Sequence, residues 1–300
     1  MADIRLGVHT GQQDIELDEL RSLWRKLDES GFDLVTVWDH FYESPPRDGW
    51  GVAYESLTLL SAMALETQQC RIGCFVFGMG YRNPAMLAKA LTTIDHLSHG
   101  RVTVGLGAGW HIPEHMEYGW GLPDVKERLD KLSEGARIMR MMFSQETTTF
   151  EGKHYKVTNA RNIPQPVNGT IPIVIGGGGE KRTMAIAARR ADEWNVGYIP
   201  PEVYAHKQQV MNEWCEKFQR DPATIKRSVQ LHFYMSSTGQ QPGAQRDGAL
   251  FGEPQQVIDR MGEYVQAGAE GINIVIRPPV DWDALQSYVE DVMPAFRSLA

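Results

Sequence analysis

The 300-residue chain has few cysteines, no excess of basic residues and no long apolar run. Its three cysteines, Cys70, Cys74 and Cys215, are too few and too irregularly spaced for a disulfide framework or a paired metal site, which favours a reducing compartment. The formal net charge of −8 argues against binding to nucleic acid or an anionic membrane, because phosphate binding needs many Lys and Arg residues. No basic-then-apolar leader opens the chain and no segment is long enough to span a bilayer, so we expect a cytoplasmic protein.

Apolar, β-branched-rich segments alternate with segments of helical period, which is the pattern of parallel βα units. We expect strands near residues 4–9, 33–38, 71–77, 102–107, 171–176, 193–197, 228–234 and 271–276. We expect helices near residues 17–30, 54–66, 84–97, 124–143, 180–190, 201–219, 254–267 and 282–298. Eight of each is the number found in a (β/α)8 TIM barrel, so the prediction is an α/β protein with one barrel domain over residues 1–300.

Three segments do not fit a βα unit and are predicted to be loops at the carboxyl-terminal mouth of the barrel. They are Phe41 to Gly51, Ala108 to Pro123, and Thr238 to Gly252. A fourth segment, Thr147 to Tyr155, predicts a short strand or hairpin. Such insertions would narrow the barrel mouth into a pocket.

The carboxyl ends of barrel strands point into one shared site, although they are far apart in sequence. Applied to the predicted strands, this rule gathers a group that is rich in glycine. The group comprises His9, Thr10, Asp39, His40, Val76 to Gly78, Gly107 to Trp110, Gly176 to Gly179, Asn195, His232, Tyr234 and Arg277.

The pair Asp39-His40 is the best candidate for moving a proton, since an imidazole titrates near neutral pH and an adjacent charge could tune it. A structural reading is equally compatible with the residues alone. In that reading Asp39 caps the following turn and His40 packs in the pocket wall.

Closely spaced glycines end the fourth strand, and aromatic, imidazole and carboxylate groups follow them in the run from Gly105 to His115. Glycine lets a backbone approach a flat ligand closely. Trp110, His111, Glu114 and His115 are candidates for lining the substrate side. Their His-x2-Glu-His order superficially suggests a metal site, but a proline interrupts the segment and the spacing is not that of helical metal ligands.

Four consecutive glycines, Gly176 to Gly179, close the fifth predicted strand and precede a helix. Free backbone amides and the helix dipole could hold a phosphate there, with Lys181 or Arg182 adding charge. The order is neither that of a nucleotide P-loop nor a good GxGxxG. A purely structural loop is the alternative.

Taken together, Val35-Thr36-Val37-Trp38-Asp39-His40-Phe41, Tyr81-Arg82-Asn83-Pro84 and Gly107-Ala108-Gly109-Trp110 resemble the bacterial luciferase-like monooxygenase family, and within it the branch that uses a deazaflavin. The resemblance implies an oxidoreductase that transfers a hydride between coenzyme F420 and a small organic substrate, with His40 and Asp39 at the reacting centre. It also implies a rare non-prolyl cis peptide at Phe75-Val76, behind the cofactor ring. The implied cofactor contacts are Asp39, Phe75, Val76, Gly78, Gly107, Ala108, Gly109, Asn195 and, for the phosphate, Gly176, Gly177, Gly178 and Gly179.

The substrate pocket is expected to include His9, Trp50, Trp110 and Glu114. Sugar-phosphate dehydrogenases of this family carry a glutamate where this chain has Trp110, which counts against a sugar-phosphate substrate. The resemblance further suggests a homodimer, in which Leu57 and its neighbours on the second helix serve either an interface or the inner packing.

Three alternatives stay open at this point. The first is a monooxygenase of the same fold that uses FMN, oxygen and a partner reductase. The second is a metal-dependent hydrolase barrel, and the third is a cofactor-binding relative without catalytic activity. The metal ligands would come from His9, Asp39, His40, His111, Glu114 and His232.

Overall fold

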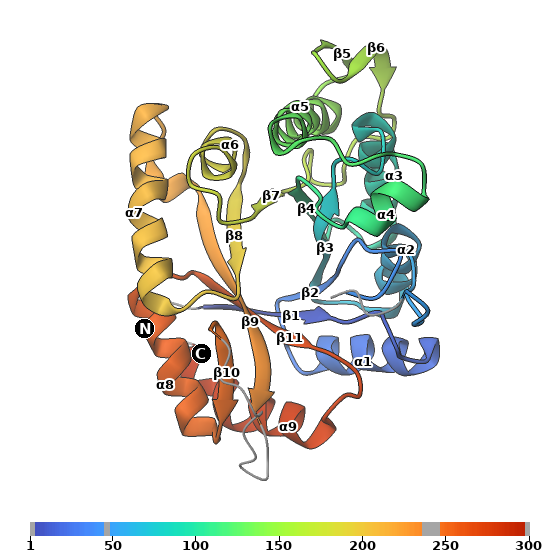
Figure 1. Ribbon diagram of the computed structural model, residues 1–300. Helices are drawn as coiled ribbons and strands as arrows, with labels where there is room; N and C mark the ends of the chain where they lie inside the picture. The colour runs from blue at the N-terminus through green and yellow to red at the C-terminus, as the bar shows by residue number, and fades with distance from the viewer. Residues whose placement is uncertain (1–3, 45–48, 236–246, 298–300) are drawn as a thin grey trace.

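A computed structural model describes residues 4–44, 49–235 and 247–297. Eight parallel strands close into a barrel in the order β1, β2, β3, β4, β7, β8, β9, β11 (Figure 1). The pairings of β8 with β9 and of β11 with β1 complete the ring. The barrel strands are β1 (Arg5–Thr10), β2 (Leu34–Val37), β3 (Arg71–Gly78), β4 (Val102–Gly107), β7 (Ile173–Gly176), β8 (Glu193–Gly197), β9 (Lys226–Met235) and β11 (Gly271–Ile276). The TIM-barrel prediction is confirmed, and each predicted strand is present to within two residues at either end.

Helices follow the strands and pack around the outside of the barrel (Figure 1). They are α1 (Leu17–Glu29), α2 (Ser56–Glu66), α3 (Pro84–Leu97), α5 (Val125–Ser144), α6 (Thr183–Arg190), α7 (Pro201–Lys217), α8 (Pro254–Gln266) and α9 (Trp282–Ser287). The last is shorter than predicted, because π-helical and 3-10 turns replace the α-helix after Ser287. The helix starts follow ordinary capping chemistry: the Asn83 side chain accepts hydrogen bonds from Ala85 and Met86 N–H, with Pro84 in the first turn.

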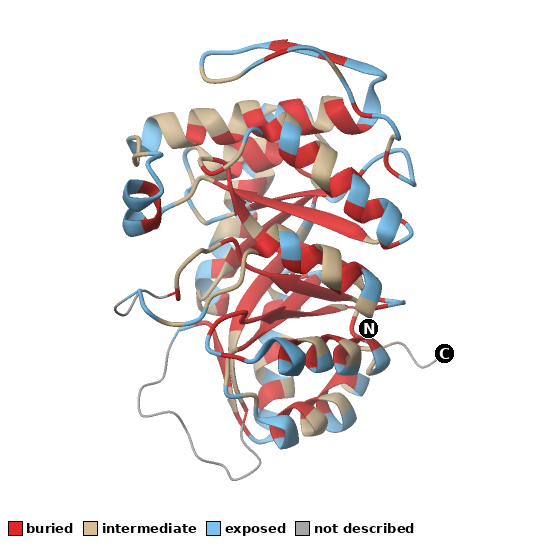
Figure 2. Ribbon diagram, turned by 90° about the vertical axis from the view of Figure 1, so that its right-hand side faces the viewer, coloured by how far each residue is buried: buried red, intermediate tan, exposed pale blue. Residues whose placement is uncertain are grey.

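The strands are buried almost throughout, while each helix is buried on one face (Figure 2). On α2, Leu60, Met63 and Ala64 are at most 2% exposed and belong to the core, so the inner-packing reading holds for these three residues. Leu57 is only partly buried beside them. No helix of the described residues is long and apolar enough to cross a membrane.

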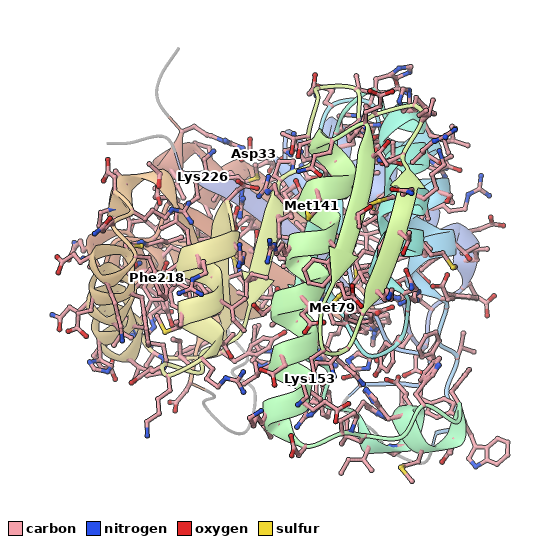
Figure 3. The ribbon with its side chains drawn as sticks, turned by 90° about the horizontal axis from the view of Figure 1, so that it is seen from above. Asp33, Met79, Met141, Lys153, Phe218 and Lys226 are labelled. Atoms are coloured by element: carbon pink, nitrogen blue, oxygen red, sulfur yellow. The ribbon has the colours of Figure 1, made fainter. Side chains whose placement is uncertain are left out.

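The two ends of the barrel differ in what they hold. In Figure 3, Asp33 and Lys226, at the amino ends of their strands, lie near each other, and Met79, which follows β3, lies well away from both. At the amino end, Arg101 donates hydrogen bonds to the carbonyl oxygens of Ala64, Thr67 and Cys70. Its guanidinium thereby ties the end of α2 to the barrel, which supports a structural role. The carboxyl end carries the loops and the site.

Two short elements lie where loops were predicted. The segment from Ala108 to Pro123 contains α4 (Ile112–Glu117), and β10 (Ala249–Gly252) pairs in parallel with β9. The hairpin expected from Thr147 consists of β5 (Thr147–Glu151) and β6 (Lys156–Arg161), and it extends six residues beyond the predicted end. Residues 45–48 and 238–246 of the other predicted loops lie outside the described residues.

Candidate functional site

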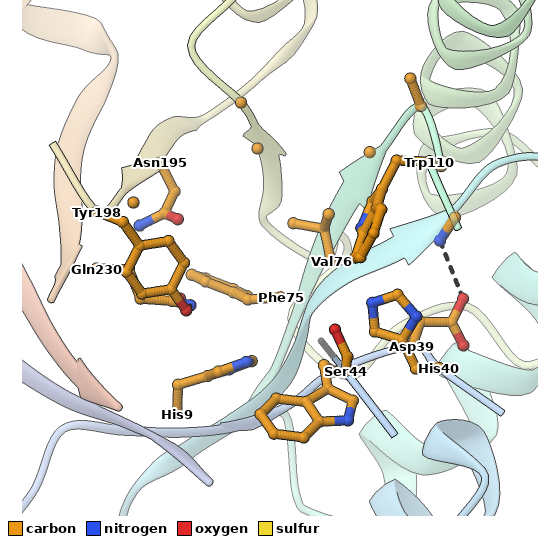
Figure 4. Close-up of a pocket in the computed structure, with 18 of the residues that line it drawn as sticks. His9, Asp39, His40, Ser44, Phe75, Val76, Trp110, Asn195, Tyr198 and Gln230 are labelled. Carbon is orange, nitrogen blue, oxygen red and sulfur yellow. Dashed lines mark hydrogen bonds between the residues drawn. The ribbon is translucent and has the colours of Figure 1, made fainter. Parts of the chain in front are cut away.

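A cavity of about 400 Å³ opens at the carboxyl-terminal mouth of the barrel, which is a size suited to a small molecule. Residues at or just past the carboxyl ends of β1, β2, β3, β4, β7, β8 and β11 contribute to its wall, together with Gln230 of β9, so the convergence predicted from the sequence is present. Its lining consists of His9, Trp38, Asp39, His40, Ser44, Phe75, Val76, Gly78, Tyr81, Gly107, Ala108, Gly109, Trp110, Gly176, Gly177, Asn195, Gly197, Tyr198, Gln230 and Arg277. In Figure 4, His40 and Trp110 lie on one side of this cavity and His9, Tyr198 and Gln230 on the other.

His40 is held by Glu114, a residue of α4 that is fully buried behind it. The Nδ1 atom of His40 lies 3.0 Å from Oε2 of Glu114. The same oxygen accepts a hydrogen bond of 2.6 Å from the Tyr81 hydroxyl. The other oxygen accepts backbone N–H bonds from Phe41 at 2.7 Å and Tyr42 at 3.1 Å. The loop after β2 is thus anchored to α4 through one carboxylate.

This environment keeps Glu114 ionised. Burial alone would raise the pKa of its carboxyl group, but the hydrogen bonds from His40, Tyr81 and Phe41 lower it to about 2. An ionised carboxylate can only accept hydrogen bonds, so the proton between the two groups belongs to Nδ1 of His40. Nε2 is the ring nitrogen that remains for chemistry in the cavity.

The Asp39 carboxylate is held by three groups that come from beyond β2. Its carboxylate accepts hydrogen bonds from Arg82 at 2.8 Å, from the Ser56 hydroxyl at 2.7 Å and from Gly78 N–H at 2.9 Å (Figure 4 shows the last). Asp39 lines the cavity, but its charge is compensated by Arg82 and it joins the ends of β2 and β3. The carboxylate that contacts His40 is Glu114, which the sequence placed on the substrate side of the pocket.

The third strand contains the cis peptide at Phe75-Val76 that the resemblance implied, and its pairing with β4 shifts there. Val76 projects into the cavity (Figure 4). The glycines of the neighbouring strands make room for it: a Cβ on Gly107 or Gly176 would lie 2.5 or 2.7 Å from a Val76 methyl carbon, and one on Gly105 would lie 2.9 Å from Val76. Gly105 and Gly107 were predicted to let a flat ligand approach, and Gly176 to help hold a phosphate. Two of them line the cavity, yet the bulge itself requires all three.

The four consecutive glycines do not all line the cavity. Gly176 and Gly177 line the cavity, whereas Gly178 and Gly179 are outside its lining. The cation beside this loop is Lys207 of α7, whose Nζ donates to the Gly178 carbonyl oxygen at 2.8 Å and pairs with Glu180 at 2.9 Å. Sequence reasoning missed Lys207 because it is about thirty positions downstream on another helix. Of the two cations proposed instead, Arg182 pairs with Asp130.

Of three further residues predicted for the site, two line the cavity and one does not. Asn195 lines the cavity and donates to the Ser228 hydroxyl at 2.8 Å. His9 lines it as well, 2% exposed, with burial and the charges of Arg277 and His40 lowering its pKa to about 3. It is therefore neutral at physiological pH. Trp50 is 90% exposed and does not line the cavity.

Of the six residues named for a metal site, only His40, His111 and Glu114 bring ligand atoms within 4.8 Å of one another in the described part of the chain. A metal there would compete with the four hydrogen bonds that Glu114 already accepts. His111 accepts one from Glu114 N–H at 3.3 Å. The donor set is thus already in use as a hydrogen-bond network.

Comparison with known proteins agrees with this geometry. Residues 1–246 match the family described as luciferase-like monooxygenase. The chain is 32% identical over 239 residues, 77% of its length and 69% of the relative's, to an F420-dependent glucose-6-phosphate dehydrogenase of Mycolicibacterium gilvum (strain PYR-GCK). The enzyme of the same description from Rhodococcus hoagii (strain 103S) is 31% identical over 76% of this chain and 68% of its own.

Solved structures share the fold at lower identity. An F420-dependent secondary alcohol dehydrogenase, in complex with an F420-acetone adduct, superposes with a TM-score of 0.87 at 18% identity, covering 99% of this chain and 100% of its own. A coenzyme F420-dependent tetrahydromethanopterin reductase from Methanopyrus kandleri gives 0.82 at 18% identity, covering 98% and 100%.

Proposed function

Because the chain belongs to the luciferase-like monooxygenase family, we propose that it is an oxidoreductase that binds coenzyme F420 and transfers a hydride between it and a small organic substrate. The observation that carries the proposal is His40, held on the cavity wall by the buried carboxylate of Glu114. The two dehydrogenases named above are described as F420-dependent, and each matches this chain over more than two thirds of its own length. They support F420 as the cofactor.

The cavity fits a flat ring with a phosphate-bearing tail. Val76 stands out from β3, because Gly105 and Gly107 of β4 and Gly176 of β7 leave space for its methyl groups, and this gives an apolar support for a ring. Residues 107–109 would border the ring. Gly176 and Gly177 would border the phosphate, and Lys207, beside the same loop, would supply a cation.

When bound, coenzyme F420 supplies the site that gives or accepts the hydride. The protein supplies the proton chemistry. In the oxidative direction, Nε2 of His40 would accept the proton of the substrate hydroxyl as the carbon that bears this hydroxyl gives its hydride to the cofactor; in the reductive direction His40 would return the proton. Glu114 keeps the Nδ1 proton in place and stabilises the imidazolium. Trp110, whose ring centroid is 5.3 Å from that of His40, forms part of the substrate wall.

We also propose one domain over residues 1–300 and a reducing, cytoplasmic location, which the sequence predicted, and a homodimer, which the resemblance implied. Barrel strands from Arg5 to Ile276 support the single domain. The outer faces of α2 and α3 expose Leu65 (65%) and Met86 (62%), which supports an interface there. Three buried free thiols support the reducing compartment.

Equilibrium binding of F420 and of FMN, each followed by fluorescence quenching, tests the proposal. We expect F420 to bind at least tenfold more tightly than FMN. A preference for FMN would assign the protein to the oxygen-using monooxygenases of the family, with a partner reductase. Binding of neither would reopen the metal-dependent and non-catalytic readings.

A second step examines His40 directly. Oxidised F420 with a panel of alcohols, hydroxy acids and glucose 6-phosphate, and reduced F420 with the corresponding ketones and enones, identifies a substrate. With that substrate, His40→Ala should lower turnover by about 10²-fold or more while the F420 dissociation constant stays within about three-fold. Unchanged turnover would remove His40 from the mechanism.

A further inference from the structure

The side of the cavity across from His40 holds a cation that the proposed proton chemistry does not use. Among the described residues that line the cavity, Arg277, just after β11, is the only Lys or Arg. The one carboxylate in that lining, Asp39, is already compensated by Arg82, which does not line it. Within residues 4–44, 49–235 and 247–297, no carboxylate forms an ion pair with Arg277. The cavity wall therefore presents an uncompensated positive charge.

The guanidinium of Arg277 is fixed in position by two contacts. Its Cζ lies 5.1 Å from the ring centroid of Trp38, and one Nη donates a hydrogen bond of 2.5 Å to the carbonyl oxygen of Ser44. Both partners also line the cavity. A guanidinium has five N–H donors, and a single one is used by Ser44. An arginine held in this way is ordered before a ligand arrives, which reduces the entropy that binding costs.

Tyr198 adds a second donor beside this charge. Its hydroxyl accepts a hydrogen bond of 2.8 Å from Nε2 of Gln230, so its own proton is available to donate. Burial raises the pKa of Tyr198, although Gln230 and Arg277 lower it in part, and the hydroxyl stays protonated. Its ring stacks on His232, with centroids 4.1 Å apart.

The backbone of Tyr198 is in the left-handed region, with φ of 63°. That conformation is unfavourable for a residue with a bulky side chain, and it persists where the surrounding structure requires it, often at functional sites. Here it places the tyrosine ring in the cavity lining. The fold thus holds an aromatic hydroxyl at this position against its local preference.

We propose that Arg277 and Tyr198 form a subsite for the carboxylate of an organic-acid substrate, whose reacting carbon then lies toward His40. This inference rests on the proposed function, since it names the substrate class for the same cavity. A carboxylate fits because it only accepts hydrogen bonds and matches the planar fork of a guanidinium. Among the described residues, this side of the cavity offers one cation, which matches the single negative charge of a carboxylate better than the two of a phosphate monoester. Burial and the charges of Arg277 and His40 lower the pKa of His9, so His9 is neutral and adds no second positive charge.

The test compares benzoate with its neutral isostere benzamide. NMR titration of the protein, with and without bound F420, gives a dissociation constant for each probe. We expect benzoate to bind at least tenfold more tightly than benzamide, and Arg277→Met to remove the difference. Arg161→Met, at an exposed position on β6, is the matched control and should keep it. Equal affinities of the two probes for the wild-type protein would overturn the inference.

Two further variants guard against a folding defect. Tyr198→Phe removes only the hydroxyl and should weaken benzoate about three- to tenfold without affecting benzamide. Arg277→Lys keeps the charge but loses the fork, and should retain part of the preference. Unchanged benzoate affinity in both variants would contradict the subsite even if Arg277→Met unfolds.

The remaining outcomes separate this inference from the proposed function. If F420 fails to bind, the proposed function fails, but the benzoate preference of the coenzyme-free protein still tests the subsite. If Arg277→Met weakens F420 more than tenfold, Arg277 is a cofactor ligand and the inference is wrong. It is also wrong if inorganic phosphate or glucose 6-phosphate displaces benzoate at a lower concentration than benzoate itself requires.

Discussion

Replacing Glu114 by glutamine changes the position of one proton while leaving the shape of the site almost intact. In the wild-type protein, Oε1 accepts the backbone N–H groups of Phe41 and Tyr42, and Oε2 faces Nδ1 of His40 and the Tyr81 hydroxyl. A glutamine can keep its oxygen toward the backbone donors. Its NH2 group then faces His40 and donates to Nδ1, so the imidazole proton moves to Nε2. The nitrogen that should accept the substrate proton is thereby blocked.

The expected magnitude follows from these contacts. Loss of correct protonation at a general base lowers turnover by about 10² to 10⁴-fold. Loss of a buried charge-assisted hydrogen bond lowers the free energy of unfolding by about 1.5–3 kcal/mol. The F420 dissociation constant should change by less than about three-fold, because Glu114 does not line the cavity.

Nitrogen-15 NMR of the histidine rings reports the tautomer without any substrate. We expect the proton on Nδ1 in the wild-type protein and on Nε2 in Glu114→Gln. Glu117→Gln is the matched control on the same helix, since Glu117 accepts from the Tyr42 hydroxyl at 2.7 Å and is exposed. A Glu114→Gln protein with the wild-type tautomer and wild-type turnover would refute the assignment of Glu114 as the residue that positions His40.

Three other substitutions examine the framework of the site. The pKa of His9 is about 3 in the folded protein, against an ordinary value of 6.5. Between these two values the unfolded chain binds a proton that the folded protein does not. The free energy of unfolding should therefore fall by about 1.4 kcal/mol per pH unit as the pH drops from 6.5 toward 3. Urea unfolding at pH 7, 6 and 5 should show a shallower fall in His9→Gln; an identical slope would mean that other groups cause it. Gly107→Ala should lower the free energy of unfolding by about 1–3 kcal/mol, since its Cβ would lie 2.5 Å from a Val76 methyl, and Val76→Ala in the same chain should restore part of the loss. Arg101→Met should cost on the order of 3 kcal/mol in denaturant unfolding with F420 affinity unchanged, as it leaves buried carbonyl groups unpaired at the far end of the barrel.

Much of the architecture is predictable from the sequence because its causes are local. The strands are short apolar runs, and the helices have one apolar face and recognisable start signals such as Asn83-Pro84. The cis peptide at Phe75-Val76 was implied by family resemblance rather than by any periodicity. The helix α4 was missed, because it has only six residues, with a proline near the start, and so few residues do not show a helical pattern of apolar positions.

The site was only partly predictable, because its decisive contacts join segments that are distant in sequence. Adjacency suggested Asp39 as the partner of His40, yet the contact is made by Glu114, seventy-four positions away. Successive residues at a strand end point in different directions, so neighbouring side chains in the sequence need not meet. Lys207, which lies on α7, likewise contacts a glycine loop that is distant from it in the sequence.

The two buried carboxylates of the site, Asp39 and Glu114, have different partners. Asp39 and Glu114 are both buried, but Asp39 is neutralised by Arg82 and serves the junction of β2 and β3. Among the described residues, the Glu114 carboxylate pairs with no Lys or Arg, so the charge that it places next to His40 is stabilised mainly by hydrogen-bond donors. A proton gained by His40 during turnover would therefore complete an ion pair in the interior. Since that pair would exist only after His40 has taken the substrate proton, we expect Glu114 to contribute to the rate rather than to substrate binding.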